Sequence, residues 1–219
     1  MNFSKEIAVI VPVGPQDNAW ETLYKDLEKY FNFLDVVFVG AESLPPFLRN
    51  CRWVQVQKAS RAHQINIGAQ TTKKKFLWIL HCDSRIDAQT IFSLNQSLKV
   101  APQSLHYFNL KFSKDGGALM WLNTLGVWVR SHLLKLPFGD QGFCISRKVF
   151  KKLGGMNEFL KSGEDHHFVW KALKQGIPIK CTNDWLETSA RKYRQNGWMK
   201  TTCKHVFYTT KQVLDFSRI

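Results

Sequence analysis

IAVIVPVGPQDNAW, residues 7–20, passes from one kind of structure to another within a few residues. Its first seven residues are apolar and mostly β-branched, which is typical of a strand buried on both faces of a parallel sheet. Gly14, Pro15 and Asp17 then supply turn chemistry, and Asn18 is a candidate helix cap. Apolar residues recur after it at helical spacing, namely Trp20, Leu23, Leu27 and Phe31. The stretch therefore predicts a strand, a turn and a helix in that order.

The alternation of strand and helix continues to about residue 99. Apolar runs predict further strands at 35–43, 53–56 and 76–80. Helices are expected from Ser60 to Ala69 and from Asp87 to about Lys99. Four alternations indicate an α/β fold with a mostly parallel, right-handed sheet flanked by helices. Ligands of such sheets bind at the carboxyl ends of the strands.

The second half of the chain is less regular. Its pattern predicts a strand at 105–112, a helix with broad apolar faces at 117–136, a short helix ending at Leu153, and a helix at 164–175. A basic tail follows at 189–211. Since no repeat, low-complexity tract or linker divides the sequence, we predict one domain over residues 1–219.

The composition narrows the classes of function. Lys and Arg number 31 against 17 Asp and Glu, so the net charge is +14, which attracts nucleic acid, sugar nucleotides, phospholipid head groups or phosphorylated acceptors. The five cysteines form no CxxC pair, which argues against a zinc ribbon or a disulfide framework and favours a reducing cytoplasm. No signal peptide or membrane span is expected, so we predict a soluble or peripheral protein.

Three potential metal ligands, His81, Cys82 and Asp83, follow the strand at 76–80. Neighbouring strand residues point to opposite faces and no HxxxH or CxxC lies near, so a zinc site is a poor interpretation. We expect Cys82 to pack as a small apolar residue and His81 to be structural. A carboxylate at this position suits a hard cation that keeps water and phosphate ligands, but the tripeptide by itself favours a cap of the next turn as the role of Asp83.

Three other groups of polar residues have both a structural and a functional interpretation. Glu164 and Asp165 open a predicted helix, where acids stabilise the helix dipole, but one of them could be a general base. Asp140 and Gln141 lie between two glycines and could form only a turn. The basic tail is either a solvated face or a clamp for phosphates.

Taken in order, the motifs resemble one enzyme family. The segments are IAVIVPV, SRAHQINIGA, FLWILHCDS, LPFGDQGFCISRKVFKKLGG, EDHHFVWKALKQG and TSARKYRQNGWMKT. Together they resemble small bacterial family 2 glycosyltransferases over about residues 5–210, in particular a subgroup with a His-Ala-Asp triplet and a Pro-Tyr-Gly-Asp-Gln segment. The resemblance implies a GT-A-type fold, with a Rossmann-like nucleotide-sugar-binding half at about 1–100. An acceptor-side catalytic half with a basic C-terminal helix would follow at about 101–219.

The resemblance also implies a donor site for a nucleoside-diphosphate sugar, with UDP favoured over GDP. Pro12 and Val13 match the end of the nucleotide-binding strand, and Glu42 matches an acidic position after the second strand. The usual Asn-Glu after the proline is replaced by Gly14-Pro15-Gln16. Further donor contacts are expected from the segment before the fourth strand and from the tail: Arg61, Gln64, Asn66, Arg191 and Arg194.

The same resemblance implies inverting sugar transfer that depends on Mg²⁺ or Mn²⁺. Asp83 matches the last Asp of the family's metal motif, and His205 is a second candidate ligand. Asp165, beside Glu164, matches the base that deprotonates the acceptor hydroxyl. Asp140 and Gln141 would line the acceptor or donor-sugar pocket. The acceptor is unknown, and a lipid-linked or membrane-adjacent molecule is one option.

Three other functions compete with this one. A nucleotidyltransferase would usually carry a glycine-rich loop with a basic residue after its first strand, which PVGPQDNAW does not offer. A nucleic-acid-binding module fits the charge, but no recognised binding motif is present. A membrane-surface protein fits the apolar helix, through residues such as Trp121, Leu122, Leu125, Trp128 and Val129, although core packing would explain them as well. Peripheral attachment to the inner face of a membrane is compatible with the enzyme reading.

Overall fold

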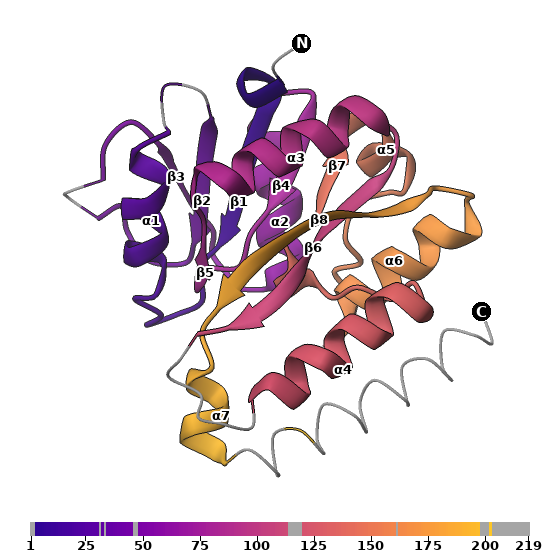
Figure 1. The fold of residues 1–219 in the computed structure, drawn as a ribbon. Coiled ribbons are helices and arrows are strands. Elements are labelled where there is room, and N and C mark those ends of the chain that lie inside the picture. The colour runs from indigo at the N-terminus through magenta and orange to yellow at the C-terminus, as the bar shows by residue number, and fades with distance from the viewer. Residues whose placement is uncertain are drawn as a thin grey trace.

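The computed structural model describes residues 3–30, 32, 34–45, 48–113, 120–160, 162–197 and 202. Its strands form one eight-stranded sheet in the order β3-β2-β1-β4-β7-β6-β8-β5 (Figure 1). The strands are β1 (Ile7–Pro12), β2 (Asp35–Gly40), β3 (Arg52–Gln55), β4 (Phe76–Ile79), β5 (Ser84–Arg85), β6 (Leu105–Phe112), β7 (Cys144–Ser146) and β8 (Ile179–Thr188). The helices are η1 (Phe3–Glu6), α1 (Trp20–Glu28), α2 (Arg61–Gln70), α3 (Ala88–Val100), α4 (Met120–Leu133), η3 (Gly139–Gln141), α5 (Arg147–Lys152), α6 (Glu164–Lys174) and α7 (Arg191–Asn196).

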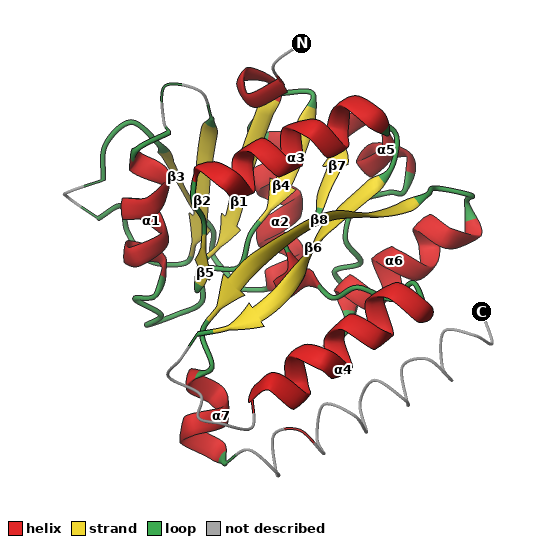
Figure 2. Cartoon of the chain, in the orientation of Figure 1, coloured by secondary structure: helices red, strands yellow, loops and turns green. Residues whose placement is uncertain are grey.

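Helices cover both faces of the sheet, with α3 in front and α2 behind in the view of Figure 2. The alternation of side chains along β1 explains these two layers, because successive residues of a strand face opposite sides. Val9 and Val11 pack in one core with α1 and α3, while Ala8 and Ile10 pack in a second core with α2 and α6. All of β1 is buried, as the apolar run predicted.

The strand pairing is parallel in the first half and mixed in the second. Strands β3, β2, β1 and β4 are parallel neighbours, as expected from four strand–helix alternations. Strand β7 is antiparallel to both β4 and β6, and β8 is parallel to β6 but antiparallel to β5. The sequence did not predict β5, β7 or β8. The first two are only two and three residues long, and β8 is a partly exposed strand without an apolar run.

Helix boundaries lie close to the expected ones, and one expected helix cap is wrong. Asp87 caps α3, because its carboxylate accepts from the backbone N–H of Thr90 at 2.8 Å. Asn18 is not the cap of α1, since that helix begins at Trp20 and the carboxylate of Asp17 accepts from the N–H of Ala19. Helix α4 lies within the expected 117–136, whose first residues fall outside the described part of the chain. No helix among the described residues is long and apolar enough to cross a membrane.

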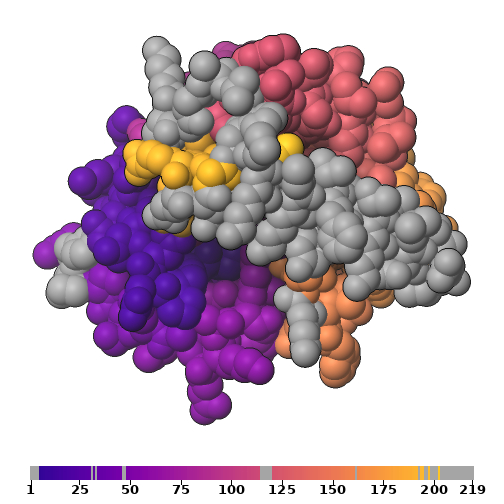
Figure 3. Space-filling model, turned by 90° about the horizontal axis from the view of Figure 1, so that it is seen from below, coloured from indigo at the N-terminus to yellow at the C-terminus, as the bar shows by residue number. Residues whose placement is uncertain are grey.

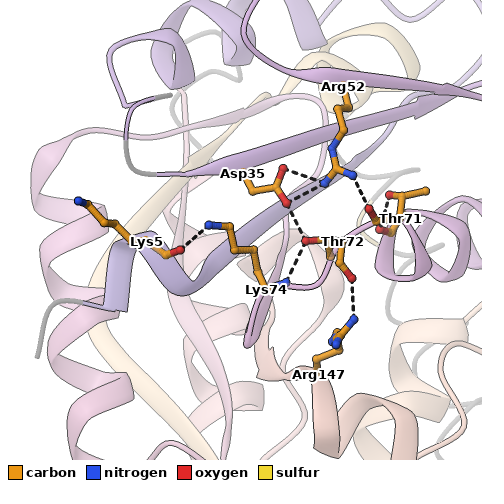
Figure 4. Close-up of polar contacts among 8 residues, drawn as sticks. Lys5, Asp35, Arg52, Thr71, Thr72, Lys74 and Arg147 are labelled. Carbon is orange, nitrogen blue, oxygen red and sulfur yellow. Dashed lines mark hydrogen bonds and ion pairs between the residues drawn. The ribbon is translucent and has the colours of Figure 1, made fainter.

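A polar network joins the segments at the amino ends of β2 and β3 (Figure 4). The carboxylate of Asp35 accepts from Arg52 at 2.7 and 2.8 Å and from the Thr72 hydroxyl at 2.7 Å. Arg147 donates to the Thr72 carbonyl at 2.6 Å, which connects α5 to the same point. This network lies at the amino ends of the parallel strands, opposite the edge where open α/β sheets bind ligands, so we assign it to stability.

We expect Asp35→Ala to lower the free energy of unfolding by about 1–3 kcal/mol, since Arg52 and Thr72 lose their common acceptor. The ion pair itself adds little, because the Arg52 side chain is 41% exposed. Urea unfolding followed by circular dichroism measures the change. Glu28→Ala, at the exposed end of α1, is the matched control and should change stability by less than about 0.5 kcal/mol. Equal losses in the two variants would refute a structural role for the network.

Candidate active site

The loops that follow β1, β2 and β4 meet at one edge of the sheet. Val13 follows β1, and its N–H donates to the carbonyl of Val39 in β2 at 2.8 Å. Gln64, which is 2% exposed, donates through Nε2 to the carbonyls of both residues at 2.7 Å. The structure thus places Gln64 beneath Pro12 and Val13, where it holds the two strand ends together. The side-chain N–H groups of Gln64 are therefore bonded to the backbone.

Arg61, at the first turn of α2, connects three residues of the site. Its Nε donates to the buried carboxylate of Glu164, and its Nη2 lies 3.9 Å from Oδ2 of Asp165. Its Nη1 lies 3.1 Å from Nε2 of His81. Since a guanidinium only donates, this ring nitrogen accepts, and His81 carries its proton on Nδ1. The Nε2 atom of His81 is therefore engaged by Arg61.

The opposite charges of Arg61 and the two carboxylates beside it keep Arg61 and Asp165 ionised. Burial opposes the charge of Arg61, but the carboxylates of Asp165 and Glu164 raise its pKa above the ordinary value. Burial also opposes the charge of Asp165, yet Arg61, His166 and two backbone N–H donors hold its pKa below the ordinary value. Asp165 is therefore ionised at neutral pH.

The turn Phe138–Gln141 lies directly against Asp165. The N–H of Gly139 donates to Oδ2 of Asp165 at 2.9 Å. A Cβ atom at Gly139 would lie 3.2 Å from the same oxygen and 3.3 Å from Nε2 of His81, so only glycine fits without displacement. Gln141 fixes the turn from the other side, because its side chain accepts from Ser131 at 2.9 Å and donates to the Phe108 carbonyl at 2.9 Å. Gln141 is 1% exposed, so it positions its neighbours.

Asp140 is a half-buried acid with little direct compensation. Its Oδ1 is buried and has no hydrogen-bond partner among the described residues. Burial raises the pKa of Asp140 to about 6, against the opposing effect of Arg130. The guanidinium of Arg130 lies over the ring of Phe138, 3.0 Å from its centroid, and donates to Gln141 at 3.2 Å. A buried carboxyl group with an incomplete set of partners is a common mark of a functional site.

Asp83 lies just past β4, where the sequence predicts a metal ligand. Its Oδ1 accepts from the hydroxyl of Thr188 at 3.3 Å. No group of three or more His, Cys, Asp and Glu side chains gathers as a metal site within the described residues. Asp83 therefore fits a cation only if phosphate oxygens and water complete the coordination, which is the way Mg²⁺ commonly binds. His205, the second expected ligand, lies outside the described residues.

An ion pair connects the loop after β1 with α7. Arg191 donates to both carboxylate oxygens of Asp17, at 2.8 and 2.5 Å, and the thiol of Cys82 donates to Asp17 at 3.2 Å. Hydrogen bonds from Arg191 lower the pKa of Asp17 to about 2. Burial, followed by the charge of Asp17, raises the pKa of Cys82 to about 12, so this thiol is not ionised. The structure thus places Arg191 against the loop after β1, with its guanidinium bound to Asp17.

Three other expected donor residues lie apart from this group. Glu42 is exposed and accepts from the N–H of Gln16 at 2.9 Å. Arg194 is exposed on α7. Asn66 accepts from the N–H of Met156 at 2.8 Å and donates to its carbonyl at 2.9 Å, so it joins α2 to the loop before α6. The geometry gives Asn66 a structural contact and leaves Glu42 and Arg194 at the surface.

An open cavity of about 670 Å³ adjoins Arg61 and Glu164. Its walls come from the start of α2 and from the loop before α6: Lys58, Ala59, Ser60, Arg61, Ala62, His63, Glu158, Phe159, Leu160 and Glu164. The ion pair of Arg61 and Glu164 therefore borders a space large enough for a small organic molecule.

No protein-family model matches the chain, and no curated protein matches its sequence. Several solved structures match its fold. Full TarS from S. aureus matches with a TM-score of 0.62 at 17% identity, covering 84% of this chain and 36% of TarS. Residues 1–349 of TarS in complex with UDP-GlcNAc match with a TM-score of 0.62 at 17% identity, covering 84% of this chain and 58% of that one. The complex of the same residues with UDP matches with a TM-score of 0.60 at 16% identity, covering 84% of this chain and 60% of that one.

The chain spans less than two thirds of each of these three structures. At such identities the likeness shows the fold, and the expected fold class is confirmed: an α/β protein with a GT-A-type central sheet flanked by helices. It assigns no role to any single residue.

Three residues of the site were not predicted as functional: Asp17, Arg130 and His166. Asp17 reads as a turn residue in the sequence, and its partner Arg191 is 174 positions away. Arg130 lies in an apolar helix. His166 directly follows Glu164 and Asp165 in the sequence, and the interpretation of that segment rested on these two acids. A lone cation in a helix without acids is the one signal that could have drawn attention to Arg130.

Proposed function

We propose that this chain is an inverting, metal-dependent glycosyltransferase that moves a sugar from a nucleoside-diphosphate sugar, with UDP as the favoured nucleotide, to an acceptor hydroxyl. One observation carries the proposal. Two adjacent carboxylates, the buried one of Glu164 and the half-buried one of Asp165, are held by Arg61 at the carboxyl ends of parallel strands. Ligands of open α/β sheets bind at that edge. The complexes of TarS with UDP-GlcNAc and UDP support the same donor class on a related fold.

The donor would lie over the loops after β1 and β2, with Pro12, Val13 and Glu42 nearest to the nucleoside. Gln64 and Asn66 would act by fixing these loops and α2. Arg61 and Arg191, with Arg194 at the rim, would supply positive charge for the diphosphate. Guanidinium groups suit this task because they bind phosphate oxygens in pairs.

The metal of the proposal is Mg²⁺ or Mn²⁺. Asp83 would hold it, with His205 as the second candidate, and phosphates and water would complete its coordination. Such a cation would stabilise the negative charge that develops on the leaving nucleoside diphosphate.

Asp165 is the proposed general base. The acceptor hydroxyl attacks the anomeric carbon, the bond from that carbon to the diphosphate breaks, and the hydroxyl proton passes to Asp165. A carboxylate with a lowered pKa accepts this proton late, when the new C–O bond has made the hydroxyl acidic. Glu164 and Gly139 would keep Arg61 and Asp165 in place during the step.

The acceptor would approach past Asp140 and Gln141. We propose a hydroxyl on a lipid-linked or otherwise membrane-adjacent molecule, modified on the cytoplasmic face of a membrane to which the chain binds peripherally. The free cysteines Cys51, Cys82, Cys144 and Cys181 accord with a reducing compartment.

A donor screen tests the proposal. Purified protein is incubated with UDP- and GDP-sugars, with Mg²⁺, Mn²⁺ or EDTA, and release of the nucleoside diphosphate is measured. Slow metal-dependent hydrolysis of at least one donor is expected. Release of pyrophosphate from a nucleoside triphosphate and a sugar phosphate would instead identify a nucleotidyltransferase.

Asp17→Asn should tighten the binding of UDP about three- to tenfold, because Arg191 no longer has to leave a paired carboxylate before it reaches the diphosphate. Isothermal titration with UDP and Mn²⁺ measures the change. Asp26→Asn is the matched control, since Arg85 contacts Asp26 through two similar hydrogen bonds on α1, and it should leave UDP binding unchanged. Weaker binding by Asp17→Asn would mean that Asp17 itself contacts the nucleotide.

A further inference from the structure

Helix α4 presents an apolar face to the solvent. Large apolar residues along it and in the turn that follows are 38% to 68% exposed: Trp121, Leu122, Leu125, Trp128, Val129, Leu133 and Leu134. Those within the helix are spaced by three, four and seven residues, which returns them to one side. Single exposed apolar residues are ordinary, but a continuous row of them marks a binding surface.

The charges around this face favour an anionic partner. Residues 116–139 contain no Asp or Glu, and neither do residues 189–214, which carry six Lys and Arg. Thr202, from the second segment, lies beside α4, since the side chain of Asn123 donates to its hydroxyl at 3.2 Å. Figure 3 shows α4 (pink) and α7 (yellow) on the same face. Basic side chains that flank an apolar helix face are attracted to anionic lipid head groups.

The length of α4 decides how such a helix meets a bilayer. It has 14 residues, whereas about 20 are needed to span the hydrocarbon core. We propose that α4 is a docking helix that lies in the plane of an anionic bilayer, with Trp121 and Trp128 at the depth of the head groups. Tryptophan prefers that depth because its ring is apolar and its N–H is polar.

The inner side of α4 contacts the proposed acceptor pocket. Arg130 and Ser131 both donate to the side chain of Gln141, and Tyr107 donates to the Ser131 carbonyl at 3.1 Å. A docked α4 therefore brings the turn with Asp140 and Gln141 close to the bilayer surface. If the proposed transfer is correct, its acceptor hydroxyl belongs to a molecule anchored in that bilayer. This consequence rests on the proposed function, whereas the docking does not.

Flotation with vesicles tests the docking without any sugar nucleotide. The full chain should float with vesicles of phosphatidylcholine and phosphatidylglycerol, float at least about tenfold less with phosphatidylcholine alone, and be released by high salt. The double variant Trp121→Ser/Leu125→Ser should lose at least about tenfold of the bound fraction. Phe92→Ser is the control, because Phe92 is similarly exposed (56%) on α3, and it should float like the wild type.

Quenching by brominated lipid tests the depth, and circular dichroism checks that each variant folds. Trp128→Phe should lose a clear share of the lipid-induced quenching of tryptophan fluorescence. Trp185→Phe, equally exposed at 42% on β8, should keep it.

Absence of flotation at low salt, or equal flotation of the double variant, would overturn the proposal. A dimer in sedimentation that the double variant abolishes would do so too, because the face would then join two copies. Loss of donor turnover with intact flotation would instead contradict only the proposed function.

Discussion

Asp165→Asn is expected to lower the rate of sugar transfer by about 10²–10⁴-fold, because an amide cannot accept the proton of the acceptor hydroxyl. Its side-chain oxygen can still accept from the N–H of Gly139, so the turn beside it should keep its place. The affinity for UDP should change less than about threefold, since the donor is proposed to bind through Arg61, Arg191 and the loops after β1 and β2. The rate is measured by release of UDP from the UDP-sugar that the donor screen identifies, with water in place of the acceptor, and UDP affinity by titration.

Asp184→Asn on β8 is the control for this substitution, because it removes a carboxylate from the same sheet outside the site. It should leave both transfer and UDP affinity unchanged. Full transfer by Asp165→Asn would remove Asp165 from the role of base. A loss of UDP affinity as large as the loss of rate would assign Asp165 to donor binding.

Asp140→Asn is expected to raise the free energy of unfolding by about 2–3 kcal/mol near pH 8, measured in EDTA. The sign follows from the pKa, which burial raises from 3.8 to about 6 in the folded chain. Below pH 4 the carboxyl group is protonated in both states and costs nothing. Between about pH 4 and pH 6 the unfolded state loses this proton while burial keeps it on the folded state, so stability falls, and above pH 6 the whole cost is present. Removing the charge restores this stability only at the higher pH.

Urea unfolding of both proteins at pH 4 and pH 8 measures this difference. The variant should match the wild type at pH 4 and exceed it at pH 8, while its transfer activity falls. A variant that is less stable at pH 8 would show that Asp140 is needed to balance Arg130, and that its ionised form stabilises the fold. Asp184→Asn again provides the comparison at both pH values.

The sequence predicted those parts of the fold that are coded by local pattern. Strands β1, β2 and β4 are continuous apolar runs whose residues are almost all buried, and helix α3 after them has a clear start at Asp87. Strand β8 has alternating partly exposed and polar residues, because it lies next to the short edge strand β5. Its pairing with β6 depends on tertiary contacts that no local pattern records.

In the candidate site, too, local motifs identified some residues, while the contacts of others depend on the tertiary structure. Arg61, Glu164 and Asp165 were singled out by motif and are in contact in the structure. Gln64, Asn66 and Gln141 were expected at the ligand, but their side chains bond to protein groups. A motif records that a polar residue is present without recording whether its side chain points to a ligand or to the backbone. The pair of Asp17 and Arg191 depends on segments at opposite ends of the chain.

Helix α4 belongs both to the fold and to the surroundings of the candidate site. Its outer face is apolar, while its inner face holds the turn that carries Asp140 and Gln141. A helix needed only for packing would bury its large apolar residues, as α1 does with Trp20, Leu23 and Leu27. The exposed row on α4 therefore calls for a partner outside the domain.

Titration of the purified chain with UDP-sugars in the presence of Mn²⁺ tests the central claim most directly. The account predicts that at least one UDP-sugar binds with a dissociation constant in the micromolar to millimolar range, and that EDTA or Asp83→Asn weakens this binding. Binding of none of the UDP- or GDP-sugars with either metal, by protein that is shown to be folded, would contradict it.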